Sequence, residues 1–283
     1  MAERSSPRRL NRALVGAELG VTPFTVRPDA LASYALATND PNPRYLAGPA
    51  AVAGPAWPVV PAFPAFMAAA RHPDLGADLR RLLHAREEHL LHEAIGAGDR
   101  LEVRSVIESI DDHPAGETFT VRAIESAPDG RTVAEVIGTM LIRGPGRAER
   151  RESPPAPGTV VFEDSVEVAP DQMERYAQAS GDSNPIHLDR AAARRAGLRA
   201  PILHGMCTMA MALRGAVNGL AEGDPTRVRR ALVTFSRPVV PGRTLTTRYW
   251  ELGGEGDLTS YGFTTTDDGG AEVIERGEVA ISR

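Results

Sequence analysis

The chain has 283 residues, of which 42% are hydrophobic and 24% charged, ordinary values for a soluble globular protein of one or two domains. A formal net charge of -5 gives no reason to expect nucleic-acid or anionic-membrane partners. No stretch approaches the roughly 18 apolar residues of a membrane span, and the polar N-terminus lacks the apolar segment of a secretory signal. The single cysteine, Cys207, rules out an internal disulfide. We therefore expect a cytoplasmic protein.

An internal repeat organises the chain. Residues 34–43 match residues 176–185 in order and spacing, at an offset of 142 (176 - 34), and residues 98–101 match residues 242–245 at an offset of 144 (242 - 98). Two matches at nearly one offset indicate two copies of one domain.

The domain boundaries are predicted from composition. A segment at 146–158 is rich in proline, glycine and charge, as linkers are. We therefore expect an N-terminal unit at 1–145 and a C-terminal unit at 159–283.

Each half shows helical patterns followed by strand patterns. In chain order these are a helix at 61–71, strands at 101–110, 118–126 and 133–142, helices at 171–179 and 201–218, and strands at 228–237, 244–251, 259–266 and 271–282. The helix at 201–218 is apolar nearly all round, so other elements must wrap it, and a curled antiparallel sheet does so most simply. The predicted fold class is α+β.

The candidate chemistry lies in one polar segment of the second half. Asp182 and His187 are five positions apart across a proline turn, so a loop can aim both side chains at one water molecule. Asn184 and Ser180 are expected to support that loop or the substrate. Gly205 lies near the start of the long helix, where backbone N–H groups can meet developing negative charge.

These residues resemble the hydratase 2 motif of the MaoC-like dehydratase family, whose members use a hot-dog fold. The order Asp-x-Asn-Pro-x-His, which ends at His187, is followed eighteen residues later (205 - 187) by Gly205 of a His-Gly pair. The segment 237–242 also fits. The resemblance covers most of the second half and the first half only as a degraded copy, as in double hot-dog members. It implies two tandem hot-dog units, each an antiparallel sheet wrapped around a long central helix.

The resemblance also implies an activity. Members hydrate trans-2-enoyl thioesters reversibly to (R)-3-hydroxyacyl thioesters, so the chain is expected to be an enoyl-CoA hydratase or 3-hydroxyacyl-thioester dehydratase. The implied substrate is an acyl-CoA or acyl-carrier-protein thioester, with no cofactor and no metal. The sequence leaves the carrier, the chain length, the pathway and the choice between a monomer and a homodimer open.

The first half is predicted to have lost the chemistry. Asp40 and Asn42 are retained from the motif, but Tyr45 takes the place of His187. A tyrosine is a poor base near pH 7 because its pKa is about 10. We therefore expect one active site per chain, with the first half shaping the acyl tunnel.

Three aromatic residues are candidates for that tunnel. Trp57, Phe63 and Phe66 lie in an alanine- and proline-rich stretch at 47–70. An apolar stretch of this kind is also typical of ordinary core, so their role in substrate binding is a hypothesis.

Blander interpretations exist for each motif. Asp-Ser-Asn-Pro alone predicts a turn, and a lone histidine is more often structural than catalytic; the combination in family order favours catalysis. His204 is expected to make a structural hydrogen bond. His84, His89 and His92 lie in a charged segment without a metal-ligand pattern, and we expect them on a partly exposed face.

Two alternative functions remain from the sequence. A thioester hydrolase would need a nucleophile or a carboxylate on the central helix, and 201–218 contains no Asp or Glu. A non-catalytic partner subunit of a heteromeric dehydratase is the second alternative, and the intact Asp182, His187 and Gly205 argue against it.

Overall fold

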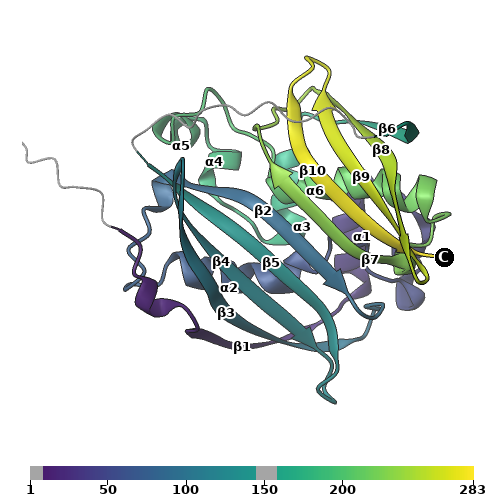
Figure 1. Ribbon diagram of the computed structural model, residues 1–283, viewed down its shortest axis with the longest axis horizontal. Coiled ribbons are helices and arrows are strands. Elements are labelled where there is room, and N and C mark those ends of the chain that lie inside the picture. Colours follow the sequence, from purple (N-terminus) through teal and green to yellow (C-terminus); the bar gives the residue numbers. More distant parts are fainter. Residues whose placement is uncertain (1–8, 145–157) are drawn as a thin grey trace, which may run out of the picture.

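The computed structural model describes residues 9–144 and 158–283. Its ten strands form one sheet in the order β1-β3-β4-β5-β2-β7-β10-β9-β8-β6 (Figure 1). The strands are β1 (Glu18–Thr25), β2 (Leu82–Leu91), β3 (Arg100–His113), β4 (Gly116–Ser126), β5 (Thr132–Arg143), β6 (Val160–Glu167), β7 (Val228–Phe235), β8 (Thr244–Glu255), β9 (Leu258–Asp267) and β10 (Glu272–Ser282). All pairings along this order are antiparallel.

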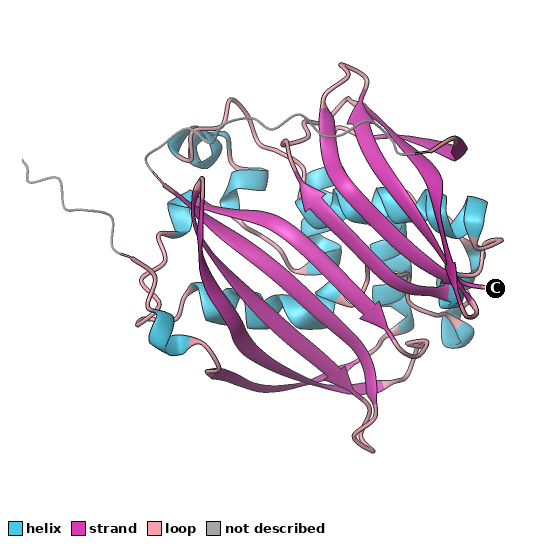
Figure 2. Cartoon of the chain, in the orientation of Figure 1, coloured by secondary structure: helices cyan, strands magenta, loops and turns pink. Residues whose placement is uncertain are grey.

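The strand order repeats between the two halves. The first half has the order β1-β3-β4-β5-β2 and the second half, from the opposite edge, has β6-β8-β9-β10-β7. The inner strand of each half, β2 in the first and β7 in the second, lies at the centre of the sheet. These two strands pair with each other, for example at Glu88 and Leu232. The two units therefore share one continuous sheet, with the helices gathered on one side of it (Figure 2). This is the expected α+β double hot-dog architecture.

Helix α2 (Val59–Ala70) is the central helix of the first half. Ala62, Phe66 and Ala69 are buried at helical spacing, and the helix contacts β1, β3, β4 and β5. Pro64 lies inside the helix, where it removes one backbone hydrogen bond. The predicted helix at 61–71 is therefore present, displaced by one or two residues.

Helix α6 (Gly205–Gly215) is the central helix of the second half and continues as a π-helical turn, η5 (Ala216–Leu220). Nearly all its side chains are buried, and it contacts β6, β7 and β8. The apolar helix is thus wrapped as expected. It begins at Gly205 and not at Pro201, because His204 has an extended backbone and Leu203 donates its N–H to the Val239 carbonyl.

The remaining helices join the two halves or form part of the loop around Asp182. They are α1 (Pro28–Ala37), α3 (Gln172–Ser180), α4 (Pro185–Leu188) and α5 (Arg190–Arg195), with 3-10 turns η1 (Arg12–Leu14), η2 (Pro43–Tyr45), η3 (Gly48–Ala50), η4 (Leu79–Arg81) and η6 (Pro225–Arg227). Helices α1 and α3 occupy equivalent places in the repeat and pack on each other, with the Tyr34 and Tyr176 rings 5.6 Å apart.

Two further sequence predictions concern the linker between the units and the absence of a membrane-spanning segment. The predicted linker at 146–158 lies outside the described residues except for Gly158. Among the described residues, no helix is both long and apolar enough to cross a membrane.

Candidate active site

The motif loop, residues 181–187, begins where helix α3 ends. Gly181 closes the helix with φ of 81°, a left-handed conformation that glycine adopts without strain. Three residues on, Asn184 accepts a hydrogen bond from the Ile186 N–H at 3.3 Å and so caps the short helix α4, whose first residue is proline. These local preferences turn the chain back on itself and place residues 182–187 at the helix ends.

Internal hydrogen bonds fix the loop. The Ser180 hydroxyl donates to the Tyr176 carbonyl at 2.8 Å and accepts from the Asp182 N–H at 3.2 Å. One Asp182 carboxylate oxygen accepts from the Asn184 N–H at 3.1 Å. Ser180 therefore ties the loop to the end of α3, and Asp182 keeps a second carboxylate oxygen for other contacts.

Two stacked histidines complete the site. The His187 and His204 rings lie 3.8 Å apart with their planes at 26°. His187 Nδ1 lies 2.8 Å from the Ile202 carbonyl, and His204 Nε2 lies 2.9 Å from the Asp182 carbonyl. A carbonyl only accepts, so each of these nitrogens has the proton, and the free lone pairs are on His187 Nε2 and His204 Nδ1. His204 has the structural role expected for it.

Burial keeps both histidines neutral. It lowers the pKa of His187 below its ordinary value, and the charge of Asp182 opposes this shift. Burial, helped by the neighbouring His187, lowers the pKa of His204 to about 3. His187 is therefore an uncharged imidazole with a free Nε2 near pH 7, the form that can accept a proton.

The same residues form a group that could be considered for a metal ion. Ligand atoms of Asp182, His187 and His204 lie within 4.8 Å of one another. A zinc ion lies about 2.0–2.1 Å from a histidine nitrogen, in the plane of the ring. Two rings stacked at 3.8 Å have nearly parallel planes and do not meet at one such ion. The residues therefore fit a metal poorly, and the expected absence of a metal stays a prediction.

The start of helix α6 lies directly beside this pair, because Gly205 follows His204. The first N–H groups of a helix have no acceptor within it and are the positive end of the helix dipole. Gly205 is half-buried, and a Cβ built on it would lie 3.3 Å from the ring of Phe235. Glycine therefore leaves a narrow approach to these N–H groups.

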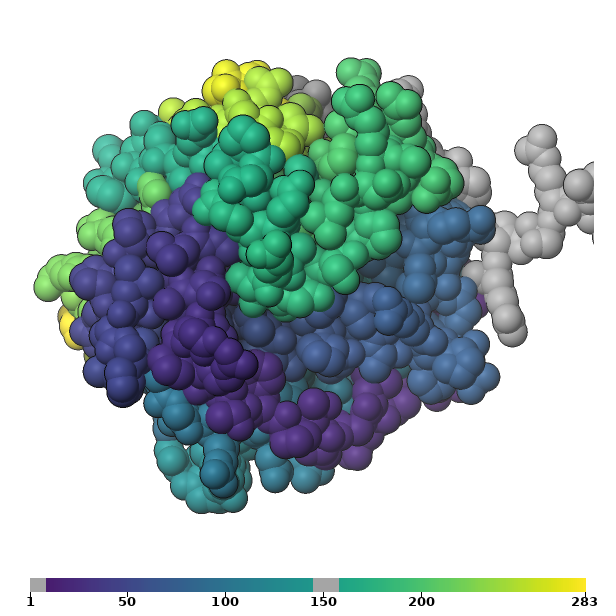
Figure 3. All heavy atoms as spheres, turned by 180° about the vertical axis from the view of Figure 1, so that it is seen from behind, coloured from purple at the N-terminus to yellow at the C-terminus, as the bar shows by residue number. Residues whose placement is uncertain are grey.

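The motif loop lies beside a groove that residues of both halves line. Residues 181–185 form one wall, and Phe63, Met67 and Leu82 of the first half are on the other, around a volume of about 710 Å³. Figure 3 shows the green segment near residue 190 against the blue segment of residues 60–85. Met67 and Leu82 were not singled out from the sequence, because apolar residues there have no signal beyond ordinary core.

The three aromatic candidates separate in the structure. Phe63 lines the groove, so its predicted role in substrate binding stays a hypothesis with a suitable position. Phe66 and Trp57 do not line it. Phe66 points into the core beside Gly138, and Trp57 is buried with its ring 5.8 Å from Phe24. The structure therefore gives these two a core position, since they face the sheet and not the loop.

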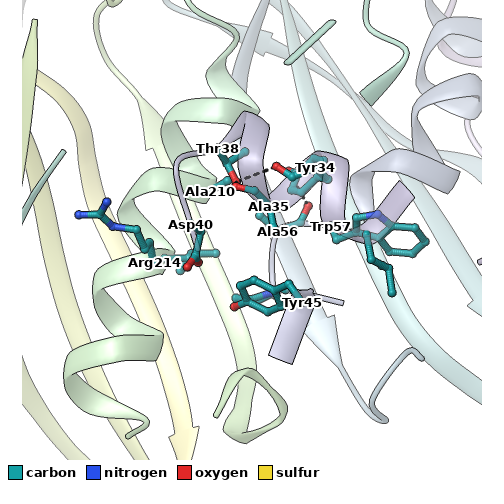
Figure 4. Close-up of a pocket in the computed structure, with 13 residues that line it drawn as sticks. Tyr34, Ala35, Thr38, Asp40, Tyr45, Ala56, Trp57, Ala210 and Arg214 are labelled. Carbon is teal, nitrogen blue, oxygen red and sulfur yellow. Dashed lines mark hydrogen bonds between the residues drawn. The ribbon is translucent and has the colours of Figure 1, made fainter. Parts of the chain in front are cut away.

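The first half retains the shape of the loop but closes it. Asn42 has φ and ψ of -55° and 123°, nearly those of Asn184, and caps η2 in the same way. Asp40 and Tyr45 face each other in a small buried pocket at the side of α6 (Figure 4). The volume open to the centre of a water molecule there is about 20 Å³, enough for about one water. This pocket is far too small for an acyl thioester.

A double hot-dog with one complete and one closed Asp–Asn loop defines a class of fused, asymmetric hot-dog proteins. Residues 153–269 match the family described as "MaoC like domain", and residues 13–136 match "FAS1-like, dehydratase domain region". The second half of the chain therefore contains a MaoC-like domain, and the first half is similar to a FAS1-like dehydratase region.

Curated relatives agree with this assignment. The chain is 27% identical over 219 residues to the peroxisomal multifunctional enzyme type 2 of Drosophila melanogaster, which covers 74% of this chain and 35% of that protein. It is 34% identical over 180 residues to 3-hydroxyacyl-thioester dehydratase Y of Mycobacterium tuberculosis, covering 60% and 61%. The chain spans less than two thirds of the length of these relatives.

Solved structures agree with the fold. A MaoC-like dehydratase from Phytophthora capsici matches with a TM-score of 0.81 and 22% identity, over 98% of both chains. At this identity the likeness concerns the fold alone.

Proposed function

We propose that the protein catalyses the reversible hydration of trans-2-enoyl thioesters to (R)-3-hydroxyacyl thioesters. One observation supports this most directly: Asp182, which lines the groove, has a carboxylate oxygen within 4.8 Å of a nitrogen of the neutral His187. His187 stacks on His204, the residue directly before the first N–H groups of α6. The relatives named enoyl-CoA hydratase 2 and 3-hydroxyacyl-thioester dehydratase support the same chemistry.

The proposed reaction uses a single water molecule held between Asp182 and His187. The pair removes one proton from the water, and the oxygen forms a bond to C3 of the enoyl group. The electrons of the double bond move towards the thioester carbonyl, whose oxygen becomes negative. The same pair supplies the proton that C2 takes up, so that water is added and no by-product leaves.

The negative oxygen is the point at which α6 acts. The N–H of Gly205 and the helix dipole stabilise charge that develops during the reaction more than the neutral ground state. The Asn184 side-chain N–H₂ has no hydrogen-bond partner among the described residues, and it lies on the groove wall. We infer that it donates to the substrate or to the attacking water.

The thioester hydrolase alternative has less support. Helix α6 contains no carboxylate. Asp164, which lies near the other end of α6, is paired with Arg214 at 2.9 Å. The groove wall formed by residues 63–82 is mainly apolar, which suits an acyl chain. The carrier, coenzyme A or an acyl carrier protein, stays open, as do the cytoplasmic location and a homodimer.

The test is hydration of crotonyl-CoA, followed by loss of enoyl-thioester absorbance and chiral analysis of the product. Wild type is compared with Asp182→Asn and His187→Ala, with Asp40→Asn as the matched control in the first half. We expect an (R)-3-hydroxyacyl product from wild type and from Asp40→Asn only. A wild type inactive on short, medium and long acyl-CoAs and on carrier-protein thioesters would favour the partner-subunit alternative.

A further inference from the structure

A buried cluster of three titratable side chains on β2 has no part in the reaction described above. Glu87 and His89 are fully buried, and His84 is about one-fifth exposed. His84 Nε2 lies 2.8 Å from one Glu87 oxygen, and His89 Nε2 lies 3.1 Å from the other. The expectation of a partly exposed face is therefore wrong for His89, whereas His84 is partly exposed and His92 is exposed.

A β-bulge brings these side chains onto one face. Side chains three positions apart on a regular strand point to opposite sides. The pairing of β2 with β5 shifts by one residue between His84 and Arg86, so that His84 lies opposite Met140 and Glu87 opposite Gly138. Since alternate residues of β5 share a face, His84 and Glu87 both point inward. Bulges often re-aim a side chain beside an active site.

The site of the buried carboxylate is made by a glycine. A Cβ built on Gly138 would lie 2.8 Å from Glu87 Oε2 and 3.0 Å from the Phe66 ring, so no larger residue fits there. His89 Nδ1 lies 2.9 Å from the Pro55 carbonyl and has a proton, because a carbonyl only accepts. Because a carboxylate oxygen also only accepts, His89 Nε2 has a proton as well, and each Glu87 oxygen then accepts one hydrogen bond, as a buried carboxylate requires.

The cluster reaches the active site through Phe235. The His84 ring meets the Phe235 ring edge-to-face, with centroids 5.1 Å apart. Phe235 in turn lies against Gly205 at the start of α6. Leu82, two residues before His84, lines the groove. A chain of contacts therefore runs from Glu87 to the N–H groups that would meet the thioester oxygen.

We propose that His84 is a positioning residue of the active site, contributed by the first half. Glu87, itself held by His89, fixes the His84 ring, and that ring holds Phe235 against the start of α6. The inference rests on the proposed function. It predicts that loosening Phe235 admits water to the Gly205 N–H and weakens stabilisation of the negative oxygen, while substrate binding in the groove is little affected.

The main test is His84→Gln, which keeps a donor for Glu87 but loses the ring. We expect kcat to fall about tenfold with KM within about twofold, because small misplacements in a site reduce turnover strongly. The matched control is His92→Gln, the same change at an exposed histidine of the same segment that pairs with Glu135. It should leave both constants unchanged. An unaltered kcat in a folded His84→Gln protein would overturn the inference.

Two further variants separate positioning from general damage. Glu87→Gln keeps an oxygen that can accept from His84 and places an N–H₂ beside His89 Nε2, which can then act as the acceptor, so it should keep kcat within about threefold of wild type. Phe235→Leu should lose about as much turnover as His84→Gln, and the double variant should lose little more than either, since both act through one contact. Independent, multiplying losses would contradict the route through Phe235.

An activity-independent measurement keeps this inference distinct from the proposed function. Crystal structures of wild type and His84→Gln should show the Phe235 ring displaced from Gly205 in the variant. A ring in the same place would overturn the inference, whether or not wild type turns over crotonyl-CoA. Inactive wild type with a displaced ring would contradict the proposed function alone.

Discussion

The two copies of the motif loop have the same backbone and opposite surroundings. In the second half, the Asn184 side-chain N–H₂ faces the groove, and Asp182 is half-exposed beside His187. In the first half, Asn42 donates through the same group to the Gly223 carbonyl at 2.9 Å. Asp40 is buried beside Tyr45. The second loop therefore has its polar side chains at the groove, whereas the first loop uses them in hydrogen bonds to the opposite unit.

Further contacts of the first loop have the same character. Asn39 donates to the Glu167 carbonyl and to the Gln172 side chain, both at 2.9 Å, and Arg44 pairs with Asp224 at 3.1 Å. All of these partners belong to the second half. The first copy of the motif is thus part of the interface that joins the two units.

The difference between the two loops is tested most strongly by making the same substitution, Asp to Asn, at the equivalent positions 182 and 40. Asp182→Asn should lower kcat by about 10³-fold, because general acid–base groups contribute roughly 10²–10⁴-fold. Asp40→Asn should leave kcat within about twofold. Steady-state hydration of crotonyl-CoA by the two variants measures both. Equal losses would show that the first loop still takes part in turnover.

Gly205→Ala tests the approach to helix α6. The added methyl group would lie 3.3 Å from the Phe235 ring and would narrow the space where the thioester oxygen binds. We expect a loss of about 10- to 100-fold in kcat/KM, somewhat below that of deleting one oxyanion donor. Circular dichroism checks that the variant is folded. Full activity in the alanine variant would remove Gly205 from the site.

Asp40→Asn should also change stability in a pH-dependent way. Burial raises the pKa of Asp40 to about 6, against an ordinary value near 3.8. The folded state therefore binds this proton more tightly, and wild-type stability is lost as pH rises from about 4 to about 6. Asparagine removes that cost, so the variant should be more stable by about 3 kcal/mol at pH 7 and no more stable at pH 4. Urea unfolding at both pH values measures this difference.

The smallest expected effect separates two neighbouring phenylalanines of α2. Phe63→Ala, in the groove, should change the preference between short and long acyl-CoAs by about threefold to tenfold with little loss of stability, since one hydrophobic contact is worth about 1–3 kcal/mol. Phe66→Ala, in the core, should cost about 3–5 kcal/mol of unfolding free energy. Chain-length profiles and thermal unfolding of both variants decide the matter. Unchanged selectivity in Phe63→Ala would remove the tunnel hypothesis for this residue.

Much of the fold follows from local patterns. The predicted strand at 118–126 corresponds to β4, and that at 133–142 differs from β5 by one residue at each end, because these strands alternate buried and exposed residues. Strand β2 was not predicted. Its sequence, Leu-Leu-His-Ala-Arg-Glu-Glu-His-Leu-Leu, has charged residues in its centre, and a polar centre seldom indicates a strand in the middle of a sheet.

In the candidate site, too, features set by local sequence could be predicted, and features set by tertiary packing could not. The loop at 180–187 was predictable because its residues are close in sequence and make local turns and caps. The groove was not, because Phe63 and Leu82 meet it only through tertiary packing. Nor was the His84–Glu87 contact, since the bulge reverses the alternation on which any prediction of facing side chains depends.

The continuous sheet also limits how copies of this chain can meet. Within residues 9–144 and 158–283, the ten-stranded sheet has two free edges, β1 and β6. Strand β1 contains Pro23, which has no N–H to offer, and its pairing shifts between Glu18 and Val21; β6 has a similar shift near Val160. An edge strand with an irregular pairing, or with a proline as in β1, is a poor template for another strand. The pairing of β2 with β7 thus lies inside one molecule, and the edge strands β1 and β6 disfavour the edge-to-edge pairing of further copies into a fibre.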